Sequence, residues 1–544
     1  MIKYKQKKFR GLIYNKYFIT KKTCKMNSNN SLSNSAATGT VWTITQSILN
    51  KFATLASLYI ISLKLTPDQF GVAALVIAIG KFAVFLPPLT MGDVIISKSH
   101  DLCQNYTRIN IFIIKVGFFI ALTITASAPL IALFYNQYQY GMLVGFIMLM
   151  SLRPLGDALA VSSLSQLRIG LKYRIIALID GWVQFSATIF TVVMVVYEYG
   201  AISILLPQII SVFIKSICYK YSVRNKINIP TIDSEANKCL DVPVSNFLTA
   251  GSAQYIHSIL DTVPILMMGR FATESQVGIY GFAVGLAGQA NAIISFQLGS
   301  VLQPIFGKLK HDIVRQKLAY LRAINAISAV IVPIALIQAV LAEPFFLLFL
   351  NPNWQPCIKV FSILSIVEAF YFATSPTIAL FKSQSRFRTY FTWQIIQLLV
   401  TISVYPFAII FGGAVGAAIA GVVLWGISLP IAVWLAIRFS GGTFYTAIWV
   451  LVAPWINSLP VAVAVFFIWE VLCSLGQLGQ ILSLFVVGPL ALIFSLWSTQ
   501  FIQPATYFEI RNLFKNIINN INRFVKLFFL PRKLHGTSKN DHFL

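Results

Sequence analysis

The chain has 544 residues, of which 57% are hydrophobic and only 11% are charged, and its formal net charge is +25. Soluble domains carry about 25% charged residues, so this composition excludes an ordinary soluble protein. In a soluble chain such a charge would indicate nucleic-acid binding. Here the basic residues lie between apolar runs, and no nucleic acid is expected as a partner.

The apolar residues form about fourteen successive runs of roughly 20 residues, each long enough to cross a bilayer of about 30 Å as a helix. We expect helices at residues 41–63, 70–91, 109–134, 141–164, 175–197, 201–219, 246–269, 277–305, 319–342, 357–380, 390–411, 415–437, 448–472 and 480–501. These runs occupy most of the chain and leave no room for a soluble catalytic domain. The sequence therefore predicts an all-α polytopic membrane protein.

The 42 Lys and Arg residues are distributed unevenly between these runs. Thirty-five of them lie in alternate gaps and in the two terminal segments, whereas the remaining gaps contain only Lys64, Arg270 and Lys359. Basic loops stay on the cytoplasmic side of a membrane. Both termini are therefore predicted to be cytoplasmic, with anionic membrane lipids near the basic loops.

A polar connection after the sixth helix divides the chain into two lobes of six helices each. The expected parts are a basic cytoplasmic arm (1–38), an N-lobe (39–222), an inter-lobe loop (223–243), a C-lobe (244–440), helices thirteen and fourteen (441–502) and an amphipathic, basic cytoplasmic tail (503–544). Met26 is a second plausible start, so the sequence leaves the translation of residues 1–25 open.

A weak internal repeat supports this division. Phe70-Gly71-Val72 opens helix two and Val277-Gly278-Ile279 opens helix eight, each shortly after a lone outer basic residue. Because six is an even number, both lobes begin on the same side of the membrane. They would then be parallel repeats related by an axis along the membrane normal.

Charged residues also fall inside the predicted helices, where each costs about 2.5–3.5 kcal/mol at the helix centre. Such residues need a partner or an aqueous cavity. Lys51, Lys81 and Arg153 all belong to the N-lobe, and a cavity lined by them suits an anionic ligand. The alternative for Arg153 is mutual neutralisation with Asp157 one helical turn later.

The carboxylates form a second set. Asp261 and Glu368 lie in the C-lobe, and with Asp157 they are candidates for binding a coupling cation, H⁺ or Na⁺. The alternative is that each carboxyl group only bonds a neighbouring hydroxyl group. Lys115 and Asp180 lie near helix ends and can extend toward water.

No catalytic motif accompanies these residues: HExxH, GxSxG and GKS/T are absent, and the six cysteines lack metal-ligand spacing. We therefore expect neither an enzyme nor a metal or cofactor. Cys357 and Cys473 both lie near the predicted outer face, so a disulfide and two separate thiols are both compatible with the sequence.

Several segments resemble a known family. Gly39-Thr40-Val41-Trp42 and the stretch from Leu63 to Gly71 resemble the G-x-x-W and L-A-R-x-L-T-P-x-D-F-G opening of bacterial polysaccharide exporters. Asp261, the stretch 268–271 and the stretch 277–280 are similar to their D-x-x-x-I-G-R and L-G-x-Y segment. Colanic-acid-type exporters are the most similar subgroup. The family shares the MOP superfamily with MATE transporters and lipid-linked oligosaccharide flippases.

The resemblance implies a two-lobed, MATE-like transporter of the bacterial inner membrane, with two additional C-terminal helices. It implies alternating-access movement of an undecaprenyl-diphosphate-linked oligosaccharide for export of surface polysaccharide, with glycan-polymerase machinery as a candidate partner. Lys51, Lys81 and Arg153 would then bind the diphosphate. The polyprenyl tail would lie along helices thirteen and fourteen. The alternative is a MATE-like, cation-coupled exporter of drugs or metabolites, which would favour an acidic cavity.

Overall fold

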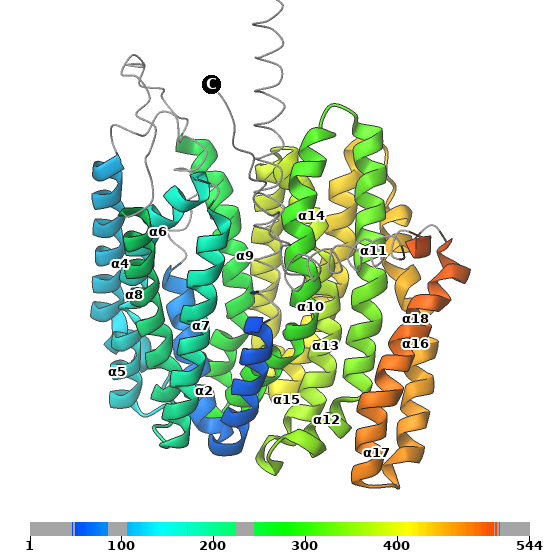
Figure 1. The fold of residues 1–544 in the computed structure, drawn as a ribbon, viewed down its shortest axis with the longest axis horizontal. Coiled ribbons are helices and arrows are strands. Elements are labelled where there is room, and N and C mark those ends of the chain that lie inside the picture. The colour runs from blue at the N-terminus through cyan, green and yellow to red at the C-terminus, as the bar shows by residue number, and fades with distance from the viewer. Residues whose placement is uncertain are drawn as a thin grey trace, which may run out of the picture.

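The computed structural model describes residues 46, 49–84, 106–170, 172–224, 244–504, 506–508 and 511. The predicted arm (1–38), most of the inter-lobe loop (223–243) and nearly all of the tail (503–544) lie outside these residues. Every regular element in the described part is helical (Figure 1). Residues 49–64 form the first described helix, which precedes α2.

The remaining α-helices follow this first helix in chain order. They are α2 (Pro67–Val84), α4 (Tyr106–Phe134), α5 (Tyr140–Met150), α6 (Arg153–Ile169), α7 (Tyr173–Val196), α8 (Ile202–Arg224), α9 (Val244–Phe271), α10 (Glu274–Lys308), α11 (Ile313–Val340), α12 (Ala342–Phe349), α13 (Cys357–Ala373), α14 (Ser375–Ser383), α15 (Phe387–Ile437), α16 (Phe444–Cys473), α17 (Gln477–Leu482) and α18 (Gly488–Ile502). A 3₁₀ turn lies at Pro352–Trp354, and a π-helical turn at Ser483–Val487 joins α17 to α18.

Nine helical segments of the described part are long and apolar enough to cross a membrane. The prediction of an all-helical, multi-pass membrane protein is therefore confirmed. The number fourteen stays a prediction, because several segments are shorter or more polar than a simple span, and one is much longer.

The longest helix, α15, is a hairpin of two antiparallel arms. Its backbone leaves the helical conformation at Gly413, with φ 55° and ψ −136°. A Cβ atom at Gly416 would overlap the Ala408 carbonyl oxygen, and Trp393 Nε1 donates to Ser428 Oγ at 3.0 Å. The chain therefore doubles back at Gly413, where only glycine is unstrained. Each arm can cross the membrane alone, as the separate ranges 390–411 and 415–437 predict.

The connections with few basic residues meet at one end of the bundle, the lower end in Figure 1. Lys64 Nζ lies 3.4 Å from Glu198 Oε1, which joins the turn before α2 to the turn after α7. Gln137 Nε2 donates to the Arg270 carbonyl oxygen at 3.3 Å, which joins the α4–α5 turn to the end of α9. We call this the outer end, after the predicted topology.

The strongly basic connections meet at the opposite end. Lys317 Nζ donates to the Ser440 carbonyl oxygen at 3.3 Å, and the Arg386 guanidinium lies 3.6 Å from the centre of the Phe439 ring. Among the described residues, the connections joined by these contacts thus lie at opposite ends according to their basic content, as the spacing of basic residues predicts. The assignment of the basic end to the cytoplasm remains a prediction from that spacing.

The helices form two side-by-side groups (Figure 1). Helices α4 to α8 pack on one another, and α9 to α18 form the larger group. Helix α2 is the main bridge between them, because it packs against α9 and α10 as well as against α5 and α6. The exact lobe boundaries stay a prediction.

The bridge at the outer end depends on two glycines. A Cβ atom at Gly71 in α2 would overlap the Glu274 carbonyl oxygen of α10, and one at Gly278 in α10 would overlap the Pro67 carbonyl oxygen of α2. These glycines are the two members of the sequence repeat. The two halves of the chain therefore touch through equivalent positions. Only glycine, which has no Cβ atom, lets the backbones of α2 and α10 approach this closely.

Trp354 strengthens the same junction. Its side chain is fully buried, its Nε1 donates to the Ser62 carbonyl oxygen at 3.0 Å, and its ring centre lies 4.2 Å from that of Phe282 and 5.8 Å from that of Phe70. One side chain from the connection after α12 thus contacts both halves of the molecule. In this conformation the outer end is closed by a shared apolar core.

We expect Gly278→Ala to force α2 and α10 apart and to lower the melting temperature of the detergent-solubilised protein. Gly285→Ala on the same helix is the control, because no atom lies within 4 Å of a Cβ there. The control should be neutral or more stable by about 0.5–1 kcal/mol, the usual helix-interior gain. Equal melting temperatures for both variants would contradict the tight junction.

Candidate functional site

Five charged residues singled out from the sequence lie at similar depth. Lys51, Lys81, Arg153, Asp261 and Glu368 are ten to fourteen residues from the outer ends of their helical segments. At 1.5 Å per residue they lie roughly 15–20 Å from that end, near the middle of a hydrocarbon core of about 30 Å. All five side chains retain accessible surface, and those of Lys81 and Asp261 are exposed. They border open space instead of being sealed in the bundle.

Two transmembrane segments are interrupted at this site. Helix α5 ends at Met150 and α6 begins at Arg153, with Pro154 in its first turn. Helix α13 ends at Ala373 and α14 begins at Ser375, with Pro376 in its first turn. Proline disrupts a continuing helix because it has no N–H group and clashes with the preceding turn. Each segment still forms one candidate membrane span, Tyr140–Ile169 and Cys357–Ser383, over the helices expected at 141–164 and 357–380, with its regular hydrogen bonding disrupted at the proline.

These interruptions occur in the fourth and tenth predicted helices, which are corresponding members of the two lobes. Interrupted helices in corresponding positions of transporter halves mark ligand sites, because they release backbone groups beside a cavity. The Arg153-Pro154 and Ser375-Pro376 pairs are the sequence signal for these interruptions. The signal was not used, because each pair lies inside a long apolar run that predicts one regular helix.

Arg153 lies at the first interruption, between α6 and α8. Its Nε atom is 3.8 Å from Asp157 Oδ2, and its Nη1 donates to Gln208 Oε1 at 3.4 Å. Lys81 on α2 is close enough to interact electrostatically with Arg153. Among the described residues, no acceptor bonds Arg153 Nε itself. Arg153 is thus partly neutralised by Asp157 and retains one free donor.

Asp261 is held by a small polar cluster on α9, α13 and α15. Tyr371 OH donates to Asp261 Oδ2 at 3.1 Å, and the Tyr371 ring lies parallel to the His257 ring with centres 5.8 Å apart. His257 Nδ1 is in turn 3.2 Å from Gln394 Nε2. Lys81 interacts electrostatically with Asp261 across the two groups of helices. Tyr371 and Gln394 were not predicted, because only the fold brings them to Asp261.

Glu368 lies on α13 beside α10. Its Oε2 atom is 3.4 Å from the position that a Cβ atom would take at Gly288 of α10. It interacts electrostatically with Asp261 and with Lys51. The sequence suggested a basic set in one lobe and an acidic set in the other. The structure brings the two sets within electrostatic reach of each other, because Lys81 interacts with Arg153 and Asp261, and Glu368 interacts with Asp261 and Lys51.

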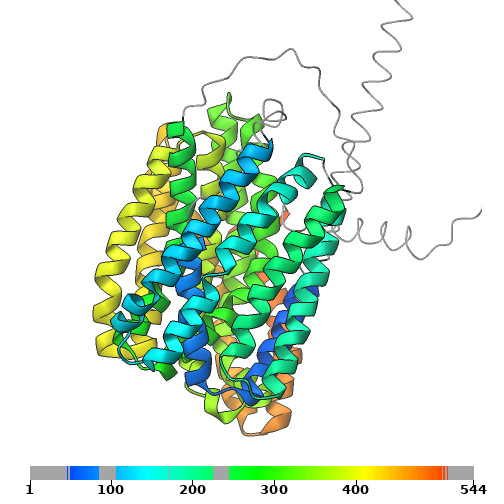
Figure 2. The same cartoon turned by 90° about the vertical axis from the view of Figure 1, so that its left-hand side faces the viewer.

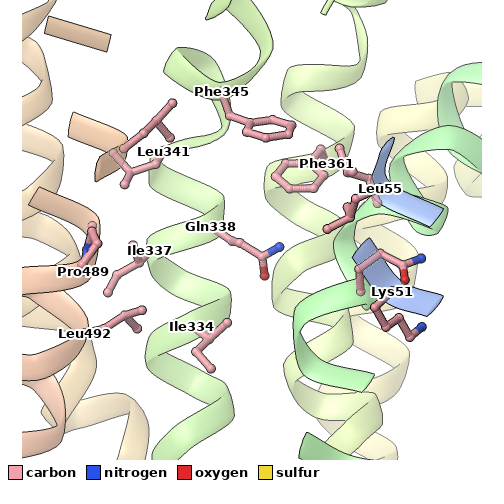
Figure 3. A pocket seen from close by; sticks show the side chains of 14 residues that line it. Lys51, Leu55, Ile334, Ile337, Gln338, Leu341, Phe345, Phe361, Pro489 and Leu492 are labelled. Atoms are coloured by element: carbon pink, nitrogen blue, oxygen red, sulfur yellow. The ribbon is translucent and has the colours of Figure 1, made fainter. Parts of the chain in front are cut away.

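A cavity of about 440 Å³ extends from Lys51 toward the last helices (Figure 3). Its walls are almost entirely apolar, and they come from the helix at 49–64 and from α10, α11, α12, α13 and α18. The lining residues are Lys51, Leu55, Leu286, Gln289, Ile334, Ile337, Gln338, Leu341, Phe345, Phe361, Leu484, Gly488, Pro489 and Leu492.

The few polar groups of this cavity lie on the side of Lys51. Figure 3 shows the Gln338 side chain projecting from α11 toward the side on which Lys51 lies. In the described part of the chain, neither Gln338 Oε1 nor Gln289 Oε1 has a hydrogen-bond partner. The cavity therefore combines one cationic, polar end with long apolar walls.

The other candidate features of the sequence, which are a disulfide, a metal site and Asp180, do not join the central charges in the described residues. Cys357 is buried and Cys473 is exposed, and both are free thiols. Within the described ranges, no three His, Cys, Asp or Glu side chains come together as metal ligands. Asp180 is paired with Lys215 at 3.1 Å and with the Tyr219 hydroxyl at 2.7 Å, and Lys215 also interacts electrostatically with Asp157.

Comparison with known proteins adds independent findings. A family described as polysaccharide biosynthesis protein matches residues 64–359. The succinoglycan biosynthesis transport protein ExoT of Rhizobium meliloti is 20% identical over 406 residues, which cover 75% of this chain and 81% of that protein. A membrane protein in the cps region of Klebsiella pneumoniae is 21% identical over 384 residues, which cover 70% and 78%.

A solved structure shows the same fold. The lipid II flippase MurJ, in an inward closed conformation, superposes with a TM-score of 0.61 at 14% identity. The match covers 86% of this chain and 99% of that one, so nearly the whole of the solved fold is present in this chain.

We expect Arg153→Gln to strand the Asp157 carboxylate and to destabilise the protein by roughly 1–3 kcal/mol, the cost of an unsatisfied buried polar group. Adding Asp157→Asn should recover most of the lost yield and thermal stability. The matched control is Arg315→Gln, which breaks the exposed Arg315–Asp312 pair and should have almost no effect. A single Arg153→Gln variant as stable as the wild type would rule out a structural role for the pair.

Proposed function

The chain belongs to the polysaccharide biosynthesis protein family, and from that membership we propose that it is a flippase for an undecaprenyl-diphosphate-linked oligosaccharide. The resemblance to polysaccharide exporters is confirmed, and the chain is a multi-pass transporter of the inner membrane. In the proposal, the lipid-linked glycan moves from the inner to the outer leaflet by alternating access, without a covalent step. A glycan polymerase is the candidate partner that would use the product.

The observation that carries the proposal is the cavity that begins at Lys51 and ends at α18. A polyprenyl diphosphate has a compact anionic group joined to a long apolar chain. The lysine ammonium group can donate hydrogen bonds to the phosphate oxygens. The walls from α11 and α18 can receive the first part of the polyprenyl chain, where burial is favourable. The glycan would occupy the accessible space beside Lys81 and Asp261.

The interleaved charges supply a route to ion coupling. Without cargo, Lys51 interacts electrostatically with Glu368, and Lys81 interacts with Asp261 as well as with Arg153. A bound diphosphate would draw the lysines away from the carboxylates of the opposite group of helices. An unpaired carboxylate at this depth is costly, so it would take up H⁺ or Na⁺. Cargo and coupling ion would thus be linked through shared lysines.

Alternating access requires the closed outer end to open. The junction at Gly71 and Gly278 and the Trp354 contacts join the two groups of helices at that end. Their separation would expose the central charges to the outer side. The Rhizobium relative is a transport protein of succinoglycan biosynthesis, which supports a glycan as the cargo.

We expect Lys51→Gln to weaken binding of the lipid-linked cargo by about 1.5–3 kcal/mol, or roughly ten- to a hundred-fold, through loss of a charge-assisted contact. Binding to the purified protein and glycan export in cells are the measurements. Lys115→Gln on α4 removes another membrane lysine, one that is exposed and outside the site. Full export and unchanged binding in Lys51→Gln would exclude Lys51 from the diphosphate site.

Neutralising the carboxylates should separate transport from the ion gradient. In proteoliposomes, Asp261→Asn and Glu368→Gln are expected to bind cargo nearly as well as wild type, but to lose most of the stimulation by an imposed H⁺ or Na⁺ gradient. If both variants respond to the gradient as wild type does, these residues have only a structural role.

A further inference from the structure

A second cavity, of about 590 Å³, lies between the two arms of the α15 hairpin. Its residues all come from α15: Arg388, Thr389, Thr392, Trp393, Ile396, Gln397 and Val400 from the first arm, and Leu424, Ile427, Ser428, Ile431 and Leu435 from the second. The Trp393–Ser428 hydrogen bond crosses between the arms. We call this cavity the hairpin groove.

The hairpin groove is separate from the central site. The opposite face of the first arm carries buried Gln394, which contacts His257 of the central cluster. The groove face instead carries exposed apolar side chains: Ile396 is 56% exposed and Ile427 is 59% exposed. Figure 2 shows the yellow arms of α15 at the outer edge of the bundle. In a membrane, exposed apolar side chains at this position face lipid.

The groove has one cationic end. Arg388 lies in the first turn of α15, at the basic end of the molecule, and its side chain is exposed. Among the described residues, no carboxylate pairs with it. Thr389 and Thr392 place hydroxyl groups beside it in the groove. A guanidinium group with nearby hydroxyls is well suited to a phosphodiester, because it can donate two parallel hydrogen bonds.

The length of the groove matches one leaflet. Arg388 and Val400 are twelve residues apart, which is roughly 18 Å of helix. Half of a bilayer core is about 15 Å. A lipid of the leaflet at the basic end would therefore place its phosphate at Arg388 and its acyl chain along Ile396, Ile427 and Val400. That leaflet is the anionic one if the basic loops are cytoplasmic.

We propose that the hairpin groove binds an anionic glycerophospholipid of the inner leaflet, with its phosphate on Arg388 and one acyl chain between the arms of α15. The lipid fills the space between the lipid-facing sides of the two arms, whose other sides share the buried core. Bound lipid therefore stabilises the C-terminal group of helices. This site does not depend on the identity of the cargo, so it stands even if the proposed cargo is wrong.

The test uses full-length protein stripped of lipid in detergent. Phosphatidylglycerol and phosphatidylcholine with the same acyl chains are titrated, with melting temperature and native mass spectrometry as readouts. Wild type should bind phosphatidylglycerol more tightly and gain stability from it. Arg388→Gln should weaken phosphatidylglycerol binding about ten-fold and phosphatidylcholine binding less, because the choline group already offsets the charge of the phosphate.

Two further variants distinguish the groove from general surface binding. Ile427→Trp fills the groove and should abolish the bound lipid, whereas Ile410→Trp, at a 60% exposed position of the same helix outside the groove, should retain it. Arg315→Gln, a cation paired with Asp312 at the basic end, is the charge control and should also retain it.

Wild-type phosphatidylglycerol binding in both Arg388→Gln and Ile427→Trp would overturn the proposal. A short-chain polyprenyl diphosphate is the competitor. If it displaces phosphatidylglycerol from the wild type and does not bind to Ile427→Trp, the groove binds the cargo and the proposal is overturned. Loss of phosphatidylglycerol in the groove variants, with both controls intact, would support the phospholipid site.

Discussion

The free-energy cost of a charged side chain at the middle of a bilayer is the constraint on which the rest of this structure depends. The fold meets that cost by bringing opposite charges together from the two halves of the chain. Lys81 on α2 lies within electrostatic reach of Asp261 on α9, and Lys51 lies within reach of Glu368 on α13, although Lys81 also interacts with Arg153. Each of these side chains also retains accessible surface. Charges that would destabilise either group of helices alone are thus compatible with the assembled pair.

The interrupted helices also help to accommodate charged side chains in the bilayer. A continuous helix satisfies all of its interior backbone groups and offers only side chains to a ligand. The interruptions before Pro154 and Pro376 release backbone groups, and they do so next to Arg153 and close to Tyr371, where the protein already needs polar partners. Sites of high polarity are therefore concentrated at one depth. The apolar cavity beside Lys51 joins that depth to α18, which supplies a place for an apolar chain.

The closed outer end opposes any separation of the two groups of helices. Its buried core contains residues of both, and the glycine contacts allow the backbones of α2 and α10 to approach closely. Opening this end would expose apolar surface, so a conformational cycle needs a compensating gain elsewhere. In the proposed function, rearrangement of the central charges around the anionic cargo would supply that gain. The two regions are linked through α2, which carries both Gly71 and Lys81.

The sequence by itself determined the class of the protein, the family and the alternation of its loops. The class and the loop alternation follow from the order of apolar runs and basic residues, which is local along the chain, and the helix pair within α15 was visible for the same reason. The family follows from short motifs such as the stretch from Leu63 to Gly71. The breaks at Pro154 and Pro376 were also encoded locally, but long apolar runs concealed them. Only the tertiary structure decided that Lys81 meets Asp261, that Tyr371 and Gln394 join the central cluster, and that the two repeated glycines touch. Residues more than a hundred positions apart come together through helix packing, and no periodicity in the sequence records which faces will pack.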